Sequence, residues 1–201
     1  RKENEEGIIF ANLGSEATVE EALQAVDMIE ANGLQIHINT IQELTMPEGD
    51  RDFTGVLNRI EQIIHKVEVP VIVKEVGFGM GIETVKKLQS IGATVVDVGG
   101  YGGTNFAKIE NERREELLPF FNDWGIPTAV SIVEAKTENP HLTVIASGGI
   151  QHSIDVVKSL SLGANAVGLA GRFLKTVTEK GLDSLINDIN RMTEEMRMIM
   201  T

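Results

Sequence analysis

The chain has 201 residues, of which 42% are hydrophobic, and its formal net charge is −12 at pH 7. This length and composition are typical of a globular domain with a sizeable core, and the acidic balance argues against nucleic acid and anionic membranes as partners. The absence of cysteine excludes disulfides, thiolate nucleophiles and cysteine-bound zinc. No apolar run approaches the ~20 residues of a membrane span and no signal peptide is recognisable, so we expect a cytoplasmic protein.

Short apolar runs alternate with helical patterns along the chain. After the first run, residues 8–12, a capping box of Thr18 and Glu21 marks the start of a helix, and Gly33 marks its end. Five more strands are predicted, over residues 34–39, 71–74, 94–98, 142–146 and 166–170. The three-four spacing of apolar residues predicts further helices over residues 53–67, 85–91, 154–160 and from 183 towards 200.

Six strands that alternate with helices imply an α/β fold with a parallel sheet. Two architectures share this pattern, an open doubly wound sheet and a closed (β/α)8 TIM barrel. An open sheet usually has its glycine-rich phosphate loop after the first strand, whereas barrels often bind phosphate after their last two strands. The glycine-rich loops come late in this chain, so we favour the barrel. Because a barrel needs about 250 residues, residues 1–201 are expected to be one incomplete barrel domain of about six β/α units.

The strand over residues 34–39 leads into a polar cluster of His37, Asn39, Gln42 and Glu43. Period-two alternation places His37 and Asn39 on the same face of the strand. A single histidine in a strand is more often a satisfied core residue than a catalyst, but the polar residues that follow favour a functional site. Glu43 suits Mg²⁺, which is often held by one or two carboxylates together with substrate phosphate. The alternative is a surface carboxylate near the start of a helix.

Lys74 is the last residue of a predicted buried strand, where an unpaired charge is costly. Its partner is either a neighbouring carboxylate, Glu75 or Asp97, or an anionic cofactor. We favour the cofactor, and a Schiff-base role is a further alternative because desolvated lysines become nucleophilic.

Three glycine-rich loops follow predicted strands, at residues 99–105, at Ser147-Gly148-Gly149 and at Ala170-Gly171-Arg172. Glycine lets the backbone approach a ligand closely, and the last two loops together offer backbone N–H groups that suit a phosphate. Tight packing of strand against helix is the alternative. The long loop from Gly99 to about Pro127 is interpreted as a lid.

The chain resembles the type 2, FMN-dependent isopentenyl-diphosphate isomerases. The segments that carry the resemblance cover nearly the whole chain in order: Ala11-Asn12-Leu13-Gly14, Leu34 to Glu43, Met46 to Arg51, Val73 to Met80, Val96 to Gly100, Gly102 to Phe106 and Ala146 to Gly149. The resemblance implies an FMN-binding (β/α)8 barrel, of which these six strands would be the third to the eighth. It also implies that the N-terminal strands and a C-terminal segment are missing.

The resemblance further implies an isomerase of isoprenoid biosynthesis, which interconverts isopentenyl and dimethylallyl diphosphate with reduced FMN, Mg²⁺ and NADPH as the reductant. It implies a homo-oligomer of four or more subunits. By position, Gln42 and His37 would be catalytic, His37, Asn39 and Gln42 would contact the substrate, and Glu43 would bind the metal. FMN contacts are implied for Asn12, Lys74, Thr104, Gly148, Gly149, Ala170 and Gly171.

Two other functions stay open at this stage. An FMN-dependent oxidoreductase of 2-hydroxy acids would use the same barrel, but it needs a histidine base late in the chain. His141 precedes a predicted strand and His152 lies near a predicted helix start, so neither suits that role. The third reading is an inactive fragment that binds flavin or phosphate.

Overall fold

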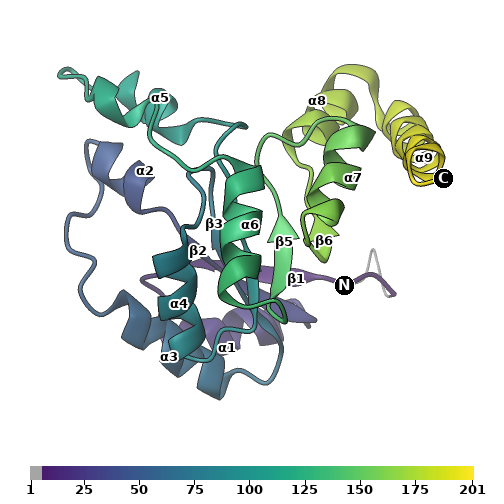
Figure 1. Cartoon of the computed structure of the whole chain (residues 1–201). Coiled ribbons are helices and arrows are strands. Elements are labelled where there is room, and N and C mark those ends of the chain that lie inside the picture. The colour runs from purple at the N-terminus through teal and green to yellow at the C-terminus, as the bar shows by residue number, and fades with distance from the viewer. Residues whose placement is uncertain (1–5) are drawn as a thin grey trace.

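Six parallel strands form one sheet in the computed structural model, which describes residues 6–201 (Figure 1). The strands are β1 (Phe10–Gly14), β2 (Gly33–Ile38), β3 (Val71–Glu75), β4 (Val95–Asp97), β5 (Thr143–Ala146) and β6 (Ala166–Val167). Their spatial order is the same as their order in the chain, and β1 and β6 form the two open edges. A doubly wound sheet reverses its strand order at a switch point. The structure therefore confirms an α/β barrel-type sheet that is not closed.

Nine α-helices and one 3-10 helix accompany the strands within residues 6–201. They are α1 (Val19–Met28), α2 (Thr40–Thr45), α3 (Val56–Lys66), α4 (Ile82–Ser90), α5 (Phe106–Asn111), η1 (Pro119–Phe121), α6 (Thr128–Glu138), α7 (Ser153–Ser161), α8 (Gly171–Lys180) and α9 (Leu182–Ile199). The predicted helices correspond to α1, α3, α4, α7 and α9. The apolar pattern missed α2 and α5 because six residues are too few to show a period, and it missed α6 because that helix buries only Ser131, Ile132 and Ala135.

The predicted capping box at the start of α1 is confirmed. The Thr18 side chain accepts a hydrogen bond from Glu21 N at 3.2 Å, and Thr18 N donates to Glu21 Oε2 at 2.8 Å. These two bonds satisfy N–H groups that the first turn of a helix otherwise leaves unpaired.

The two faces of the sheet differ in burial. Leu34, Ile36, Val73, Val96 and Val144 are all 0% exposed on one face, where they form the core under the helices. The pairing register puts Gln35 beside Ile72 and His37 beside Lys74 on the opposite face. That second face is more polar towards the carboxyl ends of the strands, which is where parallel α/β proteins hold their ligands.

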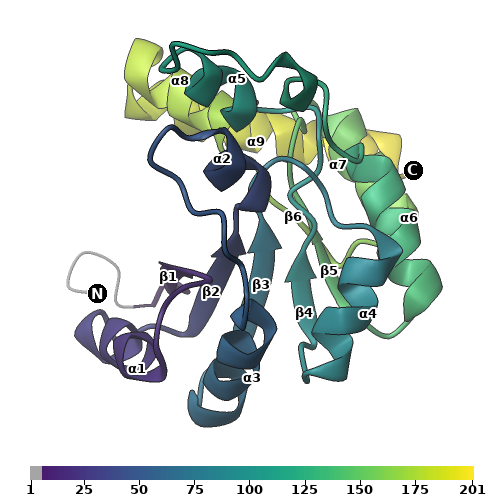
Figure 2. The same ribbon diagram turned by 90° about the vertical axis from the view of Figure 1, so that its left-hand side faces the viewer.

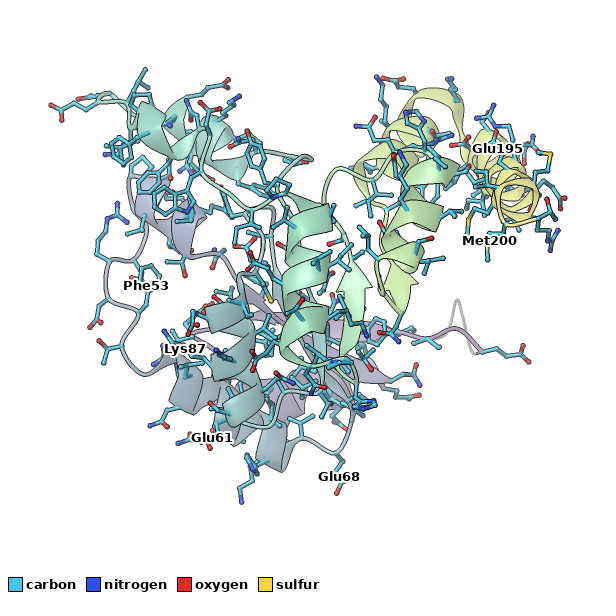
Figure 3. All side chains as sticks on the ribbon, viewed as in Figure 1. Phe53, Glu61, Glu68, Lys87, Glu195 and Met200 are labelled. Atoms are coloured by element: carbon cyan, nitrogen blue, oxygen red, sulfur yellow. The ribbon has the colours of Figure 1, made fainter. Side chains whose placement is uncertain are left out.

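The strands point their carboxyl ends towards α2, α5 and α8 (Figure 2). At the other end of the sheet, charged side chains such as Glu61, Glu68 and Lys87 project outwards from the helices and loops (Figure 3). The two ends therefore have different surroundings, and the short helices α2 and α5 lie at the carboxyl end. No helix within residues 6–201 combines the length and the apolar character needed to cross a bilayer.

Replacing Ile36 by alanine should strongly destabilise the fold. Ile36 is 0% exposed, so Ile36→Ala removes buried methyl groups and leaves a cavity, which should lower the free energy of unfolding by about 2–5 kcal/mol. Ile186→Ala is the matched control, because Ile186 on α9 is 47% exposed and its loss should change stability far less. Urea denaturation of both variants measures the difference, and equal destabilisation would contradict the assigned core.

Candidate active site at the carboxyl ends of the strands

A row of polar side chains crosses the sheet at the carboxyl ends of the central strands. The register pairs His37 of β2 with Lys74 of β3, and Lys74 with Asp97 of β4. Paired residues in parallel strands share a face, so these three side chains lie next to one another. The row contains a histidine, a lysine and an aspartate within three adjacent strands, which is a concentration of titratable groups typical of a functional site.

Lys74 does not use either neighbouring carboxylate as its hydrogen-bond partner. Its Nζ donates to the main-chain oxygen of Glu75 at 3.0 Å. Asp97 is 5% exposed and accepts hydrogen bonds from Ser147 Oγ at 2.5 Å and from Gly99 N at 3.1 Å. Burial raises the pKa of Asp97, while Ser147, Lys74 and Gly99 act in the opposite direction. The Lys74 side chain therefore lines the cavity, and its ammonium donates to a main-chain oxygen and not to a carboxylate.

Glu75 turns its carboxylate into the loop that follows β3. Its Oε2 accepts hydrogen bonds from four successive main-chain N–H groups, those of residues 76, 77, 78 and 79, over 2.6–3.3 Å. The residue is 8% exposed. Burial raises the pKa of Glu75 to about 7, and the hydrogen bonds from Phe78, Gly77, Val76 and Gly79 limit the rise.

The loops after β4 and β5 approach each other backbone to backbone. Gly100 N donates to Ser147 O at 2.8 Å, and Thr128 Oγ1 donates to Gly148 O at 2.6 Å. A Cβ atom added to Gly148 would lie 2.0 Å from Gly100 O, and φ of Gly148 is +96°, a value that side chains rarely allow. This approach keeps both loops in place and leaves the space beside them free of side chains.

A cavity of about 460 Å³ opens beside these loops, a volume within the range of small-molecule sites. It holds six of the seven residues predicted to contact FMN, namely Lys74, Thr104, Gly148, Gly149, Ala170 and Gly171. The start of α8 faces it through Ala170, Gly171 and Arg172. First-turn N–H groups have no partner within their own helix and attract anions. The structure thus brings together Lys74 and two sets of backbone donors, as an anionic ligand requires.

Asn12, the seventh predicted contact, lies outside this cavity. It is exposed on β1, where its Nδ2 is 3.4 Å from His37 Nδ1. Burial lowers the pKa of His37, and Lys74 acts in the same direction against the nearby carboxylates of Glu16 and Glu43. The lowered pKa of His37 favours the neutral imidazole. Asn12 and His37 extend the polar row towards the open edge at β1.

Gln42 and Glu43 lie on a short helix, because β2 ends at Ile38 and α2 begins at Thr40. The predicted strand over residues 34–39 thus ends one residue earlier, at Ile38, and the polar cluster continues on a helix that the sequence did not predict. The helix still projects both side chains from the carboxyl end of β2. Gln42 Nε2 donates to Glu110 Oε1 at 3.1 Å. This bond links α2 to α5 at the carboxyl ends of the strands, the edge that we call the rim.

Glu43 is held from two sides. Its Oε1 accepts from Asn39 Nδ2 at 2.8 Å and its Oε2 accepts from Asp50 N at 3.0 Å. The following loop folds back on α2, where Arg51 Nη2 donates to Met46 O at 2.8 Å. Within residues 6–201, no group of three or more His, Asp or Glu side chains is arranged to hold a metal ion. Glu43 alone therefore suits only a metal that takes most of its ligands from substrate or water.

The long loop predicted between residues 99 and 127 is folded. It contains α5 and η1, and Asn105 Nδ2 donates to Asn122 O at 2.6 Å while Asn111 Nδ2 donates to Asn122 Oδ1 at 2.7 Å. Phe106, at the start of α5, lines the cavity. The loop covers part of the rim, and its action as a lid stays a prediction.

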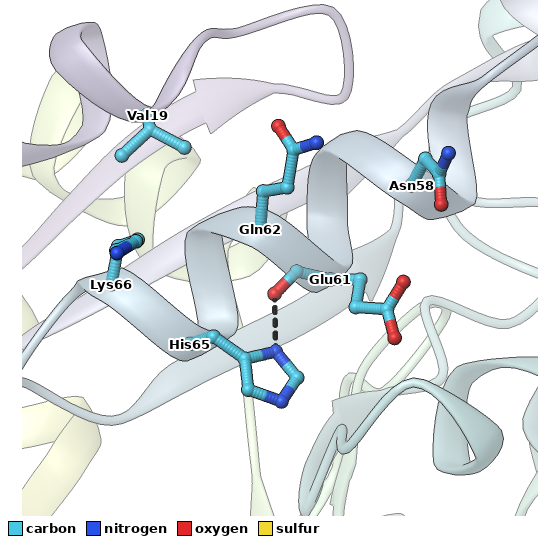
Figure 4. A pocket seen from close by; sticks show the side chains of 6 residues that line it. All are labelled: Val19, Asn58, Glu61, Gln62, His65 and Lys66. Carbon is cyan, nitrogen blue, oxygen red and sulfur yellow. Dashed lines mark hydrogen bonds between the residues drawn. The ribbon is translucent and has the colours of Figure 1, made fainter.

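A second hollow lies between α1 and α3 and shares no residue with this row (Figure 4). Its lining comprises Val19, Asn58, Glu61, Gln62, His65 and Lys66. The His65 ring bonds through Nδ1 to Glu61 O of the same helix at 2.7 Å. Since α3 ends just before β3 begins, the part of the hollow lined by His65 and Lys66 is on the amino side of the strands. It has neither glycine loops nor a buried charge, so the cavity at the carboxyl ends is the better candidate.

Sequence reasoning did not assign a site role to Glu75, Asp97 or Ser147. The first two entered only as partners for Lys74, and the structure gives each a different hydrogen-bonding role. A signal was present for Glu75, because Val76-Gly77-Phe78-Gly79 is a turn sequence that directly follows a buried acid. Ser147 lies in a glycine loop that was itself predicted.

Comparisons with known proteins agree with this geometry. Residues 17–201 match the family of FMN-dependent dehydrogenases. The chain is 60% identical to the isopentenyl-diphosphate delta-isomerase of Geobacillus sp. (strain WCH70) over 200 residues, and 62% identical over 201 residues to that of Bacillus cytotoxicus. Each alignment covers 100% of this chain but only 57% and 58% of the respective relative. The chain thus spans less than two thirds of the length of the curated relatives it matches.

Replacing Gly148 by alanine should disturb the site, whereas the same change at Gly171 should not. Gly148→Ala imposes a strained backbone and a clash with Gly100, and it should lower the free energy of unfolding by about 1–3 kcal/mol. A Cβ on Gly171 meets nothing within 4 Å, so Gly171→Ala should leave stability unchanged or slightly raised. Thermal denaturation compares the two, and an unaffected Gly148→Ala variant would refute the close approach.

Proposed function

The chain belongs to the FMN-dependent dehydrogenase family, and from this premise we propose that it works as an isopentenyl-diphosphate isomerase. The reaction interconverts isopentenyl and dimethylallyl diphosphate with reduced FMN and Mg²⁺. The observation that carries the proposal is the identity along the whole chain with proteins named for this activity. The geometry of the rim supports it, because a glycine-lined cavity adjoins the polar residues of β2 and α2.

The residues around the cavity are suited to FMN. Gly148 and Gly149 offer backbone donors without side chains in the way, and the start of α8 at Gly171 offers a second set for a phosphate. Lys74 would stabilise negative charge on the ring system, and Thr104 would contact it from the loop after β4. We propose Asn12 as a further contact through its link to His37. When bound, reduced FMN supplies a negatively charged ring that stabilises the positive charge of a protonated alkene.

We assign the substrate to the side of the rim formed by β2 and α2. His37, neutral through the lowered pKa that burial causes, would orient the diphosphate as a hydrogen-bond donor together with Asn39. Gln42 Nε2 donates to Glu110 Oε1, which leaves Gln42 Oε1 available to assist proton transfer at the hydrocarbon end of the substrate. Gln42 and His37 are thus the proposed catalytic residues. Enclosure by the surrounding loops would keep out water that could trap a cation.

Mg²⁺ would bind at Glu43 and at the diphosphate together. The protein offers one carboxylate there, already aligned by Asn39 and by Asp50 N. Mg²⁺ is commonly held by one or two carboxylates plus phosphate oxygens and water. We also propose NADPH as the reductant, because the flavin must be reduced before it acts, and a cytoplasmic homo-oligomer as the working form.

The competing function is oxidation of a 2-hydroxy acid, which the family assignment alone leaves open. That chemistry needs a histidine base near the flavin. His141 precedes β5, on the amino side of the strands, and neither His141 nor His152 lines the cavity. Anaerobic incubation of the full chain with FMN, Mg²⁺, NADPH and isopentenyl diphosphate separates the two functions. Dimethylallyl diphosphate should form without stoichiometric NADPH consumption. In a parallel aerobic incubation a 2-hydroxy acid replaces isopentenyl diphosphate, and turnover of the acid with none of isopentenyl diphosphate would refute the proposal.

Lys74→Met should weaken FMN binding. The substitution keeps the length of the side chain and removes the charge, and a charged hydrogen bond contributes roughly 1.5–3 kcal/mol, equivalent to about a ten- to hundredfold change in Kd. Quenching of flavin fluorescence measures the Kd. Lys175→Met, an exposed lysine of α8, is the control and should bind FMN normally. Equal affinities for both variants would remove Lys74 from the cofactor site.

Gln42→Ala should lower turnover about a hundredfold or more while leaving FMN bound, because it removes a group that acts on the substrate and not on the flavin. Product formation and flavin content are measured on the same preparation. Gln62→Ala, at an exposed position of α3, is the control. Loss of flavin from Gln42→Ala would contradict the assigned role.

A further inference from the structure

We infer that Glu75 is a positioning residue, whose carboxylate holds the turn of residues 76–79 and, through the main chain, the Lys74 ammonium at the edge of the cavity. Cofactor affinity should therefore follow the charge of Glu75. The inference rests on the proposed FMN site, which it deepens, since neither the family match nor the sequence pattern gives Glu75 a role.

The Glu75 carboxylate holds the turn that follows β3. Glu75 Oε2 accepts from Val76 N at 2.7 Å, Gly77 N at 2.8 Å, Phe78 N at 2.6 Å and Gly79 N at 3.3 Å. Four N–H groups that converge on one oxygen form an anion-binding turn, here filled by the protein's own side chain. The Phe78 side chain is 4% exposed, so the turn is also packed. Removing the carboxylate would leave buried donors without their acceptor.

The main chain of Glu75 connects this turn to Lys74. Lys74 Nζ donates to Glu75 O at 3.0 Å, so the same residue that organises the turn supplies the acceptor that orients the ammonium. Val76 and Gly77 line the cavity next to Lys74. A movement of residues 75–77 would therefore displace the lysine and one wall of the cavity at once.

The turn also contacts the loop that follows β4. Gly79 N also donates to Gly99 O at 3.0 Å, and Ile126 N donates to Phe78 O at 2.8 Å. A Cβ added to Gly99 would lie 2.1 Å from Glu75 O, so these two segments touch through their backbones. The turn after β3 and the loop after β4 are thus one packed unit, and Glu75 lies beneath it.

The charge of Glu75 decides how strongly the turn is held. Burial raises the pKa of Glu75 to about 7, so its charge changes near neutral pH. The charged groups on the elements around it are Lys74 on its own strand, Asp97 on β4 and Glu134 on α6, whose Oε2 accepts from Ile82 N at 2.7 Å. Above pH 7 the carboxylate attracts the four N–H groups strongly, and below pH 7 the neutral acid accepts them weakly.

As the pH rises, the turn should become better ordered, whereas the free energy of unfolding of the whole chain should fall. The folded pKa of about 7 exceeds the ordinary value of 4.5, so the folded chain holds the proton more tightly than the unfolded chain. The contribution of Glu75 to stability is therefore complete below pH 4.5 and is lost as the pH rises to 7. The turn should thus become tighter while the free energy of unfolding falls. General denaturation would instead loosen the turn as stability falls.

The test is the FMN affinity of the full chain between pH 5.5 and 8.5, measured by quenching of flavin fluorescence. In the parent protein the affinity should rise about tenfold through a midpoint near pH 7, as the carboxylate becomes charged and secures the turn. Glu75→Gln, which is always neutral, should bind weakly at every pH and show no such midpoint. Glu134→Gln is the control and should follow the parent profile. A Glu75→Gln profile that keeps the midpoint, merely displaced to weaker binding, would overturn the inference.

Hydrogen exchange of the amides of residues 76–79 without flavin gives the second readout. Exchange should be faster in Glu75→Gln than in the parent above pH 7, and unchanged exchange would also overturn the inference. If the parent protein binds no FMN at any pH, the proposed function fails, while the exchange data still report whether Glu75 holds the turn. Should Glu75→Gln not fold, Glu75→Asp keeps the charge and should retain the midpoint with weaker binding. Loss of the pH midpoint in Glu75→Asp would contradict the positioning role of Glu75.

Discussion

The close approach of the backbones of Gly100 and Gly148 is the constraint on which the rest of the site depends. A Cβ atom added to Gly148 would lie only 2.0 Å from Gly100 O, so no side chain fits between the loops after β4 and β5. The same loops therefore present main-chain groups to the cavity and are locked to each other by Thr128. Through Gly99, the lock extends to the turn after β3. A single packed unit of backbone thus forms the wall beside Lys74.

Buried acids support this wall from beneath and are not the hydrogen-bond partners of the lysine. Glu75 binds four main-chain N–H groups, and Asp97 binds Ser147 and Gly99. Each carboxylate is therefore used to fix a loop, which leaves the Lys74 ammonium directed at the cavity. A buried-strand lysine whose ammonium has no carboxylate as its hydrogen-bond partner is well suited to receive an anionic ligand.

The sheet and the site at the carboxyl ends of its strands could both be predicted from the sequence, but for different reasons. Repeated apolar runs separated by helical spacing indicate a parallel α/β sheet whatever the function, and glycine loops after late strands indicate a phosphate site in a barrel. The resemblance then assigned individual residues, and six of the seven assigned flavin contacts share one cavity. Asn12 does not, because β1 lies at the edge of the sheet, three strands away from β4. Helices α2 and α5 were missed because six residues carry no measurable period.

By itself, the sequence determined the strands, their parallel arrangement, the capping box at Thr18 and the residues that end each strand in polar or glycine-rich loops, because these follow from local periodicity and turn chemistry. Only the tertiary structure decided how those ends combine. The tertiary structure alone shows that the Glu75 carboxylate accepts hydrogen bonds from the turn that follows it. It also shows that Asp97 pairs with Ser147, and that Gln42 bonds to Glu110, 68 positions away in the chain. Such choices depend on distances between segments remote in sequence, and on the need to satisfy each buried polar group, which no local pattern contains.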